Sequence, residues 1–213
     1  VANLGGTITG GLTGVNLSNA NLNGLSNSGL VQGGMLSGVS VSNSTITGAL
    51  TNAVGGQIVG GPSGLSLRTA LINGGITNAG LITASGSAFF DQNASIITGN
   101  LTNLGGTISG GQWGINLLGT SISGVLNNTG LVQGATLGGI NIVSGANLQN
   151  GLSNSGTISG PVGINVGINT TINGLANSGS ISSIYNAGVI TRITQTAGVI
   201  TNGITNTGLI SGS

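Results

Sequence analysis

The sequence predicts an all-β protein: a single right-handed parallel β-helix, or β-solenoid, built from coils of about 25 residues with three short strands per coil. The first observation is that an asparagine followed by small residues and glycine recurs about every 25 residues along the chain. The second is that apolar residues alternate with Thr, Ser or Asn between these points, the period of a half-buried strand. The third is that Gly and Asn separate the apolar stretches and supply the conformations that tight corners require.

The recurring asparagine marks one position in each coil, and eight such anchors predict eight stacked coils. Stacked Asn side chains are able to pass hydrogen bonds from coil to coil as an amide ladder, so we expect a structural role. Capture of a ligand by the row is the alternative. The anchors are Asn3, Asn27, Asn52, Asn78, Asn103, Asn128, Asn154 and Asn177.

Each coil contains three apolar stretches, which in the second unit are residues 27–31, 38–41 and 45–50. The middle stretch alternates most clearly, and its apolar side chains are expected to face inward. Parallel crossovers are almost always right-handed, which sets the predicted hand of the helix. One inward column is expected to contain Val15, Val39, Leu65, Phe90, Ile115 and Ile140, and another Leu22, Ile46, Ile72, Ile97, Ile122, Leu148 and Ile172.

Regular coils are expected over residues 1–176, and residues 177–213 continue the same domain with a shorter repeat. In this second part similar phrases begin at Asn186, Thr196 and Asn206, ten residues apart. Two arrangements fit this spacing: three sides of one wider coil, or several tighter coils. The sequence alone leaves both open.

The fourth unit departs from the others, because Ala88-Phe89-Phe90-Asp91-Gln92 stands where other units alternate apolar and polar residues. With Phe90 in the inward column, Phe89 and Asp91 are expected to face outward. Together with Trp113 and Tyr185, these two residues are candidate contacts for a partner, since large aromatic groups often anchor interfaces. A local substitution in the packing is the alternative interpretation.

The composition excludes most catalytic chemistry. Arg68, Asp91 and Arg192 are the only charged side chains, and the chain has no Lys, Glu, His or Cys. Carboxylate pairs, Ser-His-Asp arrangements and zinc sites are therefore excluded by counting, so we expect no enzyme, no cofactor and no metal. Without a basic stripe we expect no nucleic-acid partner, and no apolar run is long enough to predict membrane insertion.

Low charge also predicts self-association. A surface that is almost neutral promotes association, and neither end of the sequence supplies a charged or helical cap for the exposed strand edges. Copies of the chain are therefore expected to continue one another's ladders head to tail, a contact that does not close and so yields a fibre.

The repeated phrase Asn-[Ser/Ala/Thr]-Gly-x-[Ile/Val] resembles the passenger repeats of bacterial autotransporters and filamentous-haemagglutinin-like adhesins. The resemblance implies secretion to a bacterial surface and a role in adhesion, aggregation or matrix. The phrase occupies residues 27–31, 78–82, 128–132, 154–158, 177–181, 186–190 and 206–210.

Three functions follow from these observations. The leading hypothesis is an extracellular structural protein that polymerises end to end into a surface or matrix fibre. The second is an adhesin rod that presents Phe89, Trp113 or loop residues to a cell surface. The third is ice binding, suggested by Thr7-Ile8-Thr9 and Thr45-Ile46-Thr47, although other units do not keep Thr at these positions.

Overall fold

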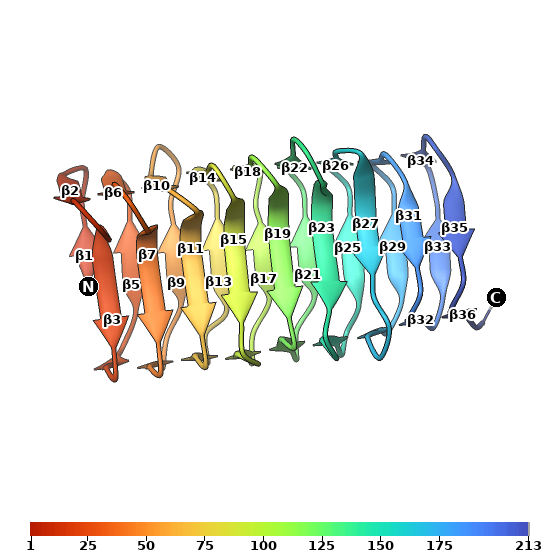
Figure 1. Ribbon diagram of the computed structural model, residues 1–213, viewed down its shortest axis with the longest axis horizontal. Coiled ribbons are helices and arrows are strands. Elements are labelled where there is room, and N and C mark those ends of the chain that lie inside the picture. Colours follow the sequence, from red (N-terminus) through yellow and green to blue (C-terminus); the bar gives the residue numbers. More distant parts are fainter. Residues whose placement is uncertain (213) are drawn as a thin grey trace.

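The computed structural model describes residues 1–212, which form a β-solenoid of nine stacked coils (Figure 1). Each coil contributes one strand to each of four parallel sheets, and every sheet has nine strands. The predicted parallel β-solenoid is therefore confirmed, but the prediction of three strands per coil was wrong. The two ends of the described chain lie at opposite ends of the rod (Figure 1).

We name the sheets A to D in the order in which a coil visits them. Sheet A contains β1 (Ala2–Asn3), β5 (Leu25–Asn27), β9 (Leu50–Asn52), β13 (Ile76–Asn78), β17 (Leu101–Asn103), β21 (Leu126–Asn128), β25 (Leu152–Asn154), β29 (Leu175–Asn177) and β33 (Ile193–Gln195). Sheet B contains β2 (Thr7–Gly10), β6 (Leu30–Gly33), β10 (Gln57–Gly60), β14 (Leu81–Ala84), β18 (Thr107–Gly110), β22 (Leu131–Gly134), β26 (Thr157–Ser159), β30 (Ser180–Ile181) and β34 (Val199–Ile200).

Sheet C contains β3 (Val15–Ser18), β7 (Ser37–Ser42), β11 (Ser63–Arg68), β15 (Ser87–Gln92), β19 (Trp113–Leu118), β23 (Gly138–Val143), β27 (Val162–Val166), β31 (Ile184–Asn186) and β35 (Ile204–Asn206). Sheet D contains β4 (Asn21–Leu22), β8 (Thr45–Ile46), β12 (Leu71–Ile72), β16 (Ile96–Ile97), β20 (Ser121–Ile122), β24 (Asn147–Leu148), β28 (Thr171–Ile172), β32 (Val189–Ile190) and β36 (Leu209–Ile210). Coil 1 is β1 to β4, coil 2 is β5 to β8, and so on to coil 9, which is β33 to β36.

The prediction missed the fourth strand because the residues that follow each anchor asparagine form a corner of the coil and not part of a strand. In coil 2 the Asn27 Nδ2 donates to the Gly29 carbonyl oxygen at 3.0 Å, and the Gly29 N–H donates back to Asn27 Oδ1 at 3.3 Å. An Asn side chain that bonds the backbone two residues on forms an Asx turn. The turn separates β5 in sheet A from β6 in sheet B, which the sequence pattern had joined.

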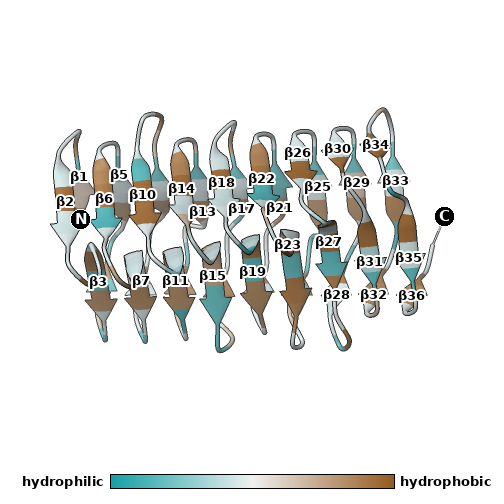
Figure 2. Cartoon of the chain, turned by 45° about the horizontal axis from the view of Figure 1, so that its top comes forward, coloured by the Kyte–Doolittle hydropathy of each residue, from teal (hydrophilic) through white to brown (hydrophobic). Residues whose placement is uncertain are grey.

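The core is a set of aliphatic columns along the rod. The predicted column from Leu22 to Ile172 is confirmed, because each member pairs with the next across sheet D. Its members from Ile46 to Ile172 are fully buried. Hydrophobic segments recur at corresponding positions of successive strands (Figure 2). This repetition allows each coil to bury its apolar face against its neighbours.

In coil 4 the predicted orientation of the two phenylalanines was wrong. Phe89 pairs with Leu65 and Ile115 and is fully buried, and Asp91 pairs with Leu67 and is also fully buried. Ala88 and Phe89 both face the core, so the alternation of inward and outward residues is interrupted at the start of the strand. Counting in strict alternation from Ala88 shifts the assignment by one residue, which reverses every face.

The ten-residue repeat near the C-terminus is half of a coil. Ile184 pairs with Ile204 and Asn186 with Asn206 in sheet C, so coils 8 and 9 have the same four strands with shorter corners. The tighter-coil arrangement is therefore the one that the structure has. Gln195 pairs with Asn177 and takes the anchor position of a ninth coil, one more than the eight that the asparagines predict.

Candidate functional site

The eight anchor asparagines form one continuous ladder inside the rod. The Nδ2 of each donates to the Oδ1 of the next at 2.8 to 2.9 Å, from Asn3 through to Asn177. The same nitrogen also lies near two backbone carbonyl oxygens, as at Asn103, where Gly106 and Leu131 accept at 2.9 and 3.1 Å. All eight side chains are buried, with both amide hydrogens engaged. The geometry is that of a structural ladder, which leaves no donor for a ligand.

Three of the four aromatic side chains lie on the outer face of sheet C. Phe90 and Tyr185 occupy one outward row, in which Asn116, Asn141 and Asn165 stand between them. These asparagines form a second, outward ladder with hydrogen bonds of 2.8 and 2.7 Å.

Trp113 lies one row away and covers Gly138, where an added Cβ would be 2.5 Å from the indole. A depression of about 330 Å³ lies beside Phe90 and is also lined by Asn116, Gln112 and Pro62. Of the predicted partner-contact residues, Trp113 and Tyr185 thus lie on this face, whereas Phe89 and Asp91 lie inside the rod. Phe90, expected inside, is the outward-facing and half-buried member of the pair.

Asp91 is the only carboxylate side chain, and the structure places it in the apolar column between Leu67 and Leu117. Thr120 Oγ1 donates to Asp91 Oδ2 at 2.7 Å, whereas Oδ1 has no partner. Burial raises the pKa of Asp91 from 3.8 to about 6, against smaller opposing effects of Ser95 and Thr120. A single buried acid without a second titratable neighbour offers no acid–base pair.

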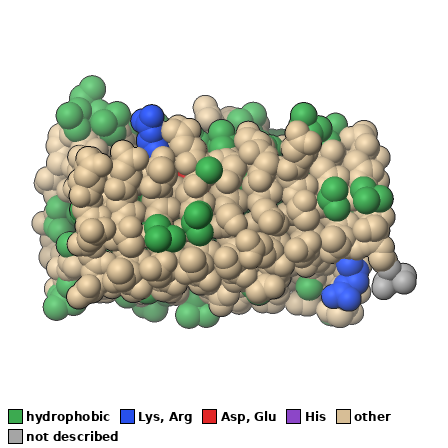
Figure 3. Space-filling view, turned by 90° about the horizontal axis from the view of Figure 1, so that it is seen from below, with side chains coloured by type: hydrophobic (Ala, Val, Ile, Leu, Met, Phe, Trp, Pro, Cys, Tyr) green, Lys and Arg blue, Asp and Glu red, His purple; other side chains and the backbone are tan. Residues whose placement is uncertain are grey.

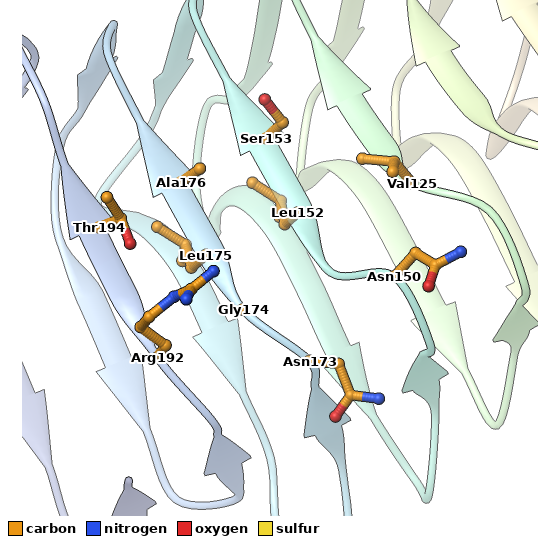
Figure 4. Close-up of a pocket in the computed structure, with 10 residues that line it drawn as sticks. All are labelled: Val125, Asn150, Leu152, Ser153, Asn173, Gly174, Leu175, Ala176, Arg192 and Thr194. Carbon is orange, nitrogen blue, oxygen red and sulfur yellow. The ribbon is translucent and has the colours of Figure 1, made fainter. Parts of the chain in front are cut away.

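A small depression of about 180 Å³ lies on sheet A near the C-terminal coils, where Arg192 is the one charged side chain (Figure 4). Asn150 and Asn173 line its rim, and their side chains point away from Arg192 (Figure 4). Both amides already donate to backbone carbonyl oxygens, of Ser123 at 2.8 Å and Gln149 at 3.0 Å. One cation without a converging acid or second cation does not form a catalytic set.

The threonines that suggest ice binding do not stack. Thr7 and Thr9 of sheet B pair with Leu30 and Gln32 in the next coil. A short row does occur on the outer side of sheet A, where Thr51, Thr77 and Thr102 occupy successive coils. The row continues as Ser26 on one side and Asn127 on the other.

The outer surface is almost free of charge, with basic side chains at two separate points of the face seen in Figure 3 and hydrophobic side chains in small spots between neutral ones. No helix long and apolar enough to cross a membrane occurs in residues 1–212. No group of three or more metal-ligating side chains occurs within the same residues.

No protein-family model, curated protein or solved structure matches this chain.

Proposed function

We propose that this chain is a structural subunit that stacks end to end into an extracellular fibre. The observation that carries the proposal is the apolar, hydrogen-bonding character of both end faces of the described coils. The strands of coil 1 and of coil 9 each pair on one side only, so eight strand edges are open. Open edges are templates for a further strand.

The side chains at these faces are those that interior coils bury. Ile204 is 42% exposed in coil 9, whereas its column partner Ile184 is 1% exposed. Ile8, Val15 and Leu22 of coil 1 are likewise only partly buried. Stacking coil 9 of one copy on coil 1 of the next removes these groups from water at about 25 cal/mol per Å² of apolar surface.

The amide ladder gives the rod a direction that favours head-to-tail stacking. Each anchor donates toward the C-terminal side and accepts from the N-terminal side, which leaves Asn3 Oδ1 as the acceptor at coil 1. Gln195 holds the anchor position at coil 9, and one hydrogen of its carboxamide remains to donate beyond the bond from Nε2 to the Gly198 carbonyl oxygen at 2.6 Å. Contact between opposite ends therefore pairs a donor with an acceptor, whereas contact between like ends does not.

Electron microscopy of the purified chain tests this proposal. We expect unbranched filaments with a 4.7 to 4.8 Å repeat along the axis by fibre diffraction. Ile8→Lys and Ile204→Lys place a charge on one end face each and should each abolish elongation, while the matched surface variant Ile168→Lys should not. Light scattering that finds only monomers at high concentration, with no filaments, would overturn the proposal.

A second candidate function, an adhesin rod, is supported by the outer face of sheet C. Phe90, Trp113 and Tyr185 share that face with the outward amides, a combination of stacking and hydrogen-bonding groups without charge. Replacing Phe90 and Tyr185 by Ser should then abolish attachment to cells without preventing filaments. Unchanged attachment of this double variant would count against an adhesin.

The proposed location is extracellular, on a bacterial surface or in a matrix, as the resemblance to autotransporter and haemagglutinin-like repeats implies. Ice binding is the third proposal, and thermal hysteresis measured on the Thr77→Leu variant and the unmodified chain tests it. A flat three-threonine row should lose its activity when its central member is replaced.

A further inference from the structure

The corner between sheets A and B alternates between two forms in coils 1 to 6. In coils 1, 3 and 5 it is wide, with an apolar residue and Gly-Gly after the anchor: Leu4-Gly5-Gly6, Val54-Gly55-Gly56 and Leu104-Gly105-Gly106. In coils 2, 4 and 6 it is tight, with one small residue and Gly: Ser28-Gly29, Ala79-Gly80 and Thr129-Gly130. The edge of the rod therefore repeats every two coils, whereas the core repeats every coil.

The wide corners project three apolar side chains, which we call the knobs: Leu4, Val54 and Leu104. Their exposed fractions are 83%, 81% and 56%. The glycine after each knob has φ of +77°, +78° and +69°, and a Cβ added there would meet nothing within 4 Å. The three glycines after the knobs thus share the left-handed conformation, and all three corners stand clear of the rod, although the corner of coil 3 is one residue longer because Ala53 precedes Val54.

The tight corners of coils 2 and 4 form notches between two knobs, and that of coil 6 forms a notch with a knob, Leu104, on one side only. A Cβ added at Gly29, Gly80 or Gly130 would lie 2.0 to 2.1 Å from the carbonyl oxygen of the preceding wide corner, so these turns nest under it. The floor of each notch is apolar, because Leu30, Leu81 and Leu131 open the sheet B strands of these coils, where coils 3 and 5 have Gln57 and Thr107. Between the corners of coils 3 and 5 the notch is a depression of about 430 Å³ lined by Ala79, Gly80 and Leu81.

We propose that two copies of this chain pair side by side and antiparallel along this edge, so that the knobs of each copy insert into the notches of the other. A two-fold axis between coils 3 and 4 sets coil k of one copy opposite coil 7 − k of the other. This operation places Leu4 opposite the notch of coil 6, Val54 opposite that of coil 4, and Leu104 opposite that of coil 2. All three knobs of each copy then meet a notch, which is the self-complementarity of an isologous interface.

The contact strip covers six coils, about 29 Å at the spacing of parallel strands. At a width of about 10 Å, two copies bury on the order of 600 Å² in total, half of the lower limit for stable interfaces. The dimer is therefore weak alone. Repetition of the contact between neighbouring rods strengthens it through avidity.

Disulfide trapping tests the pairing, because the chain has no native cysteine. A Leu4→Cys chain is mixed with a Thr129→Cys chain at about 0.5 mM and oxidised with oxidised glutathione. A disulfide requires Cα atoms within about 7 Å. Within one chain, residues 4 and 129 lie five coils apart. In a head-to-tail stack, residue 129 of one copy and residue 4 of the next copy lie four coils apart, which is about 19 Å. A Leu4–Thr129 product therefore reports the antiparallel edge contact, whether or not filaments form.

The expected result is a covalent heterodimer from this mixture and none from Leu4→Cys mixed with Ser28→Cys. A product from the second mixture only, or from neither, would overturn the proposal. Sedimentation velocity gives an independent measurement in the Ile204→Lys background. In that background, Val54→Asp should raise the dissociation constant of the dimer at least tenfold. Ile168 is also exposed, at 69%, but lies away from the knobs, so Ile168→Asp should leave the dissociation constant unchanged. Equal behaviour of these two variants would also overturn the proposal.

Discussion

Asp91 makes the stability of this protein depend on pH in the direction opposite to that of most proteins. Its pKa is raised from 3.8 to about 6 by burial, so the folded state binds the proton more tightly than the unfolded chain does. The stabilisation is fully present below about pH 3.8 and is lost as the pH rises through 6. At about 1.4 kcal/mol per pH unit, the loss amounts to about 3 kcal/mol.

The assay is urea unfolding of the unmodified chain and of Asp91→Asn between pH 4 and pH 7.5. Because Asp91 is the only side-chain carboxylate and the chain has no His, no other side chain titrates in this range. We expect the unmodified chain to lose about 2 kcal/mol of unfolding free energy between these limits, because part of the full loss has already occurred at pH 4, and Asp91→Asn to lose almost none. Measuring at several low protein concentrations separates this effect from assembly.

Leucine at this position provides a second check. Leu67 and Leu117 occupy the same column in the adjacent coils, so Asp91→Leu restores the aliphatic pattern. It should raise the unfolding free energy at pH 7.5 by about 3 kcal/mol or more, since it removes both the buried charge and its unpaired oxygen. The reasoning is refuted if the unmodified chain is equally stable at both pH values, or if Asp91→Asn keeps the dependence.

Four further substitutions test the packing, each by urea unfolding at pH 4, where Asp91 is neutral. Asn103→Leu breaks the amide ladder and strands buried donors and acceptors in the adjacent coils, so it should cost about 3 to 5 kcal/mol. Phe89→Ala opens a core cavity and should cost about 3 to 5 kcal/mol, whereas Phe90→Ala should cost less than about 1 kcal/mol; equal costs would contradict the assigned orientation. Gly80→Ala places a Cβ 2.1 Å from a backbone oxygen and should cost several kcal/mol, at least about 2.

The sequence predicts the solenoid because stacking requires coils of nearly equal length. A parallel ladder pairs each residue with its counterpart one coil away, so a period of about 25 residues is a direct image of the strand register. The apolar columns of sheet D follow from the same register, which is why their members from Leu22 to Ile172 were predicted correctly.

The number of strands could not be predicted, because the corners are too short to appear as breaks in the pattern. β8 is only Thr45–Ile46, and Thr47, Gly48 and Ala49 turn the chain before β9 begins at Leu50. Apolar residues on both sides of such a turn read as one stretch. At the other corner, between β5 and β6, the Asx turn of Asn27 marks the change of direction, and it is visible only in the structure.

The face of a residue was mispredicted where two neighbouring residues both point inward. Ala88 and Phe89 do so in coil 4, and Gly64 and Leu65 in coil 3, where a Cβ added at Gly64 would lie 2.7 Å from Ile82. A glycine or alanine at the first of these positions carries too little side chain to show which way it points. Strict period-two alternation then fails, and Asp91 was expected outside because Phe90 was assigned to the inward column.

The alternating corners cannot be explained by the packing of the core. Sheet A carries Leu or Ile and then Asn in nearly every coil, so its inner face does not distinguish wide from tight corners. Tight corners also stack on one another without wide ones between them, since Gly156 nests under Gly130 and Gly179 under Gly156 at the same 2.1 Å. The stacking of the corners therefore does not prevent coils 1, 3 and 5 from having the tight form, which lacks the exposed apolar residue found at Leu4, Val54 and Leu104. The wide corner is therefore a feature that the packing of the core does not require, and its recurrence in alternate coils agrees with the proposed edge contact between two copies.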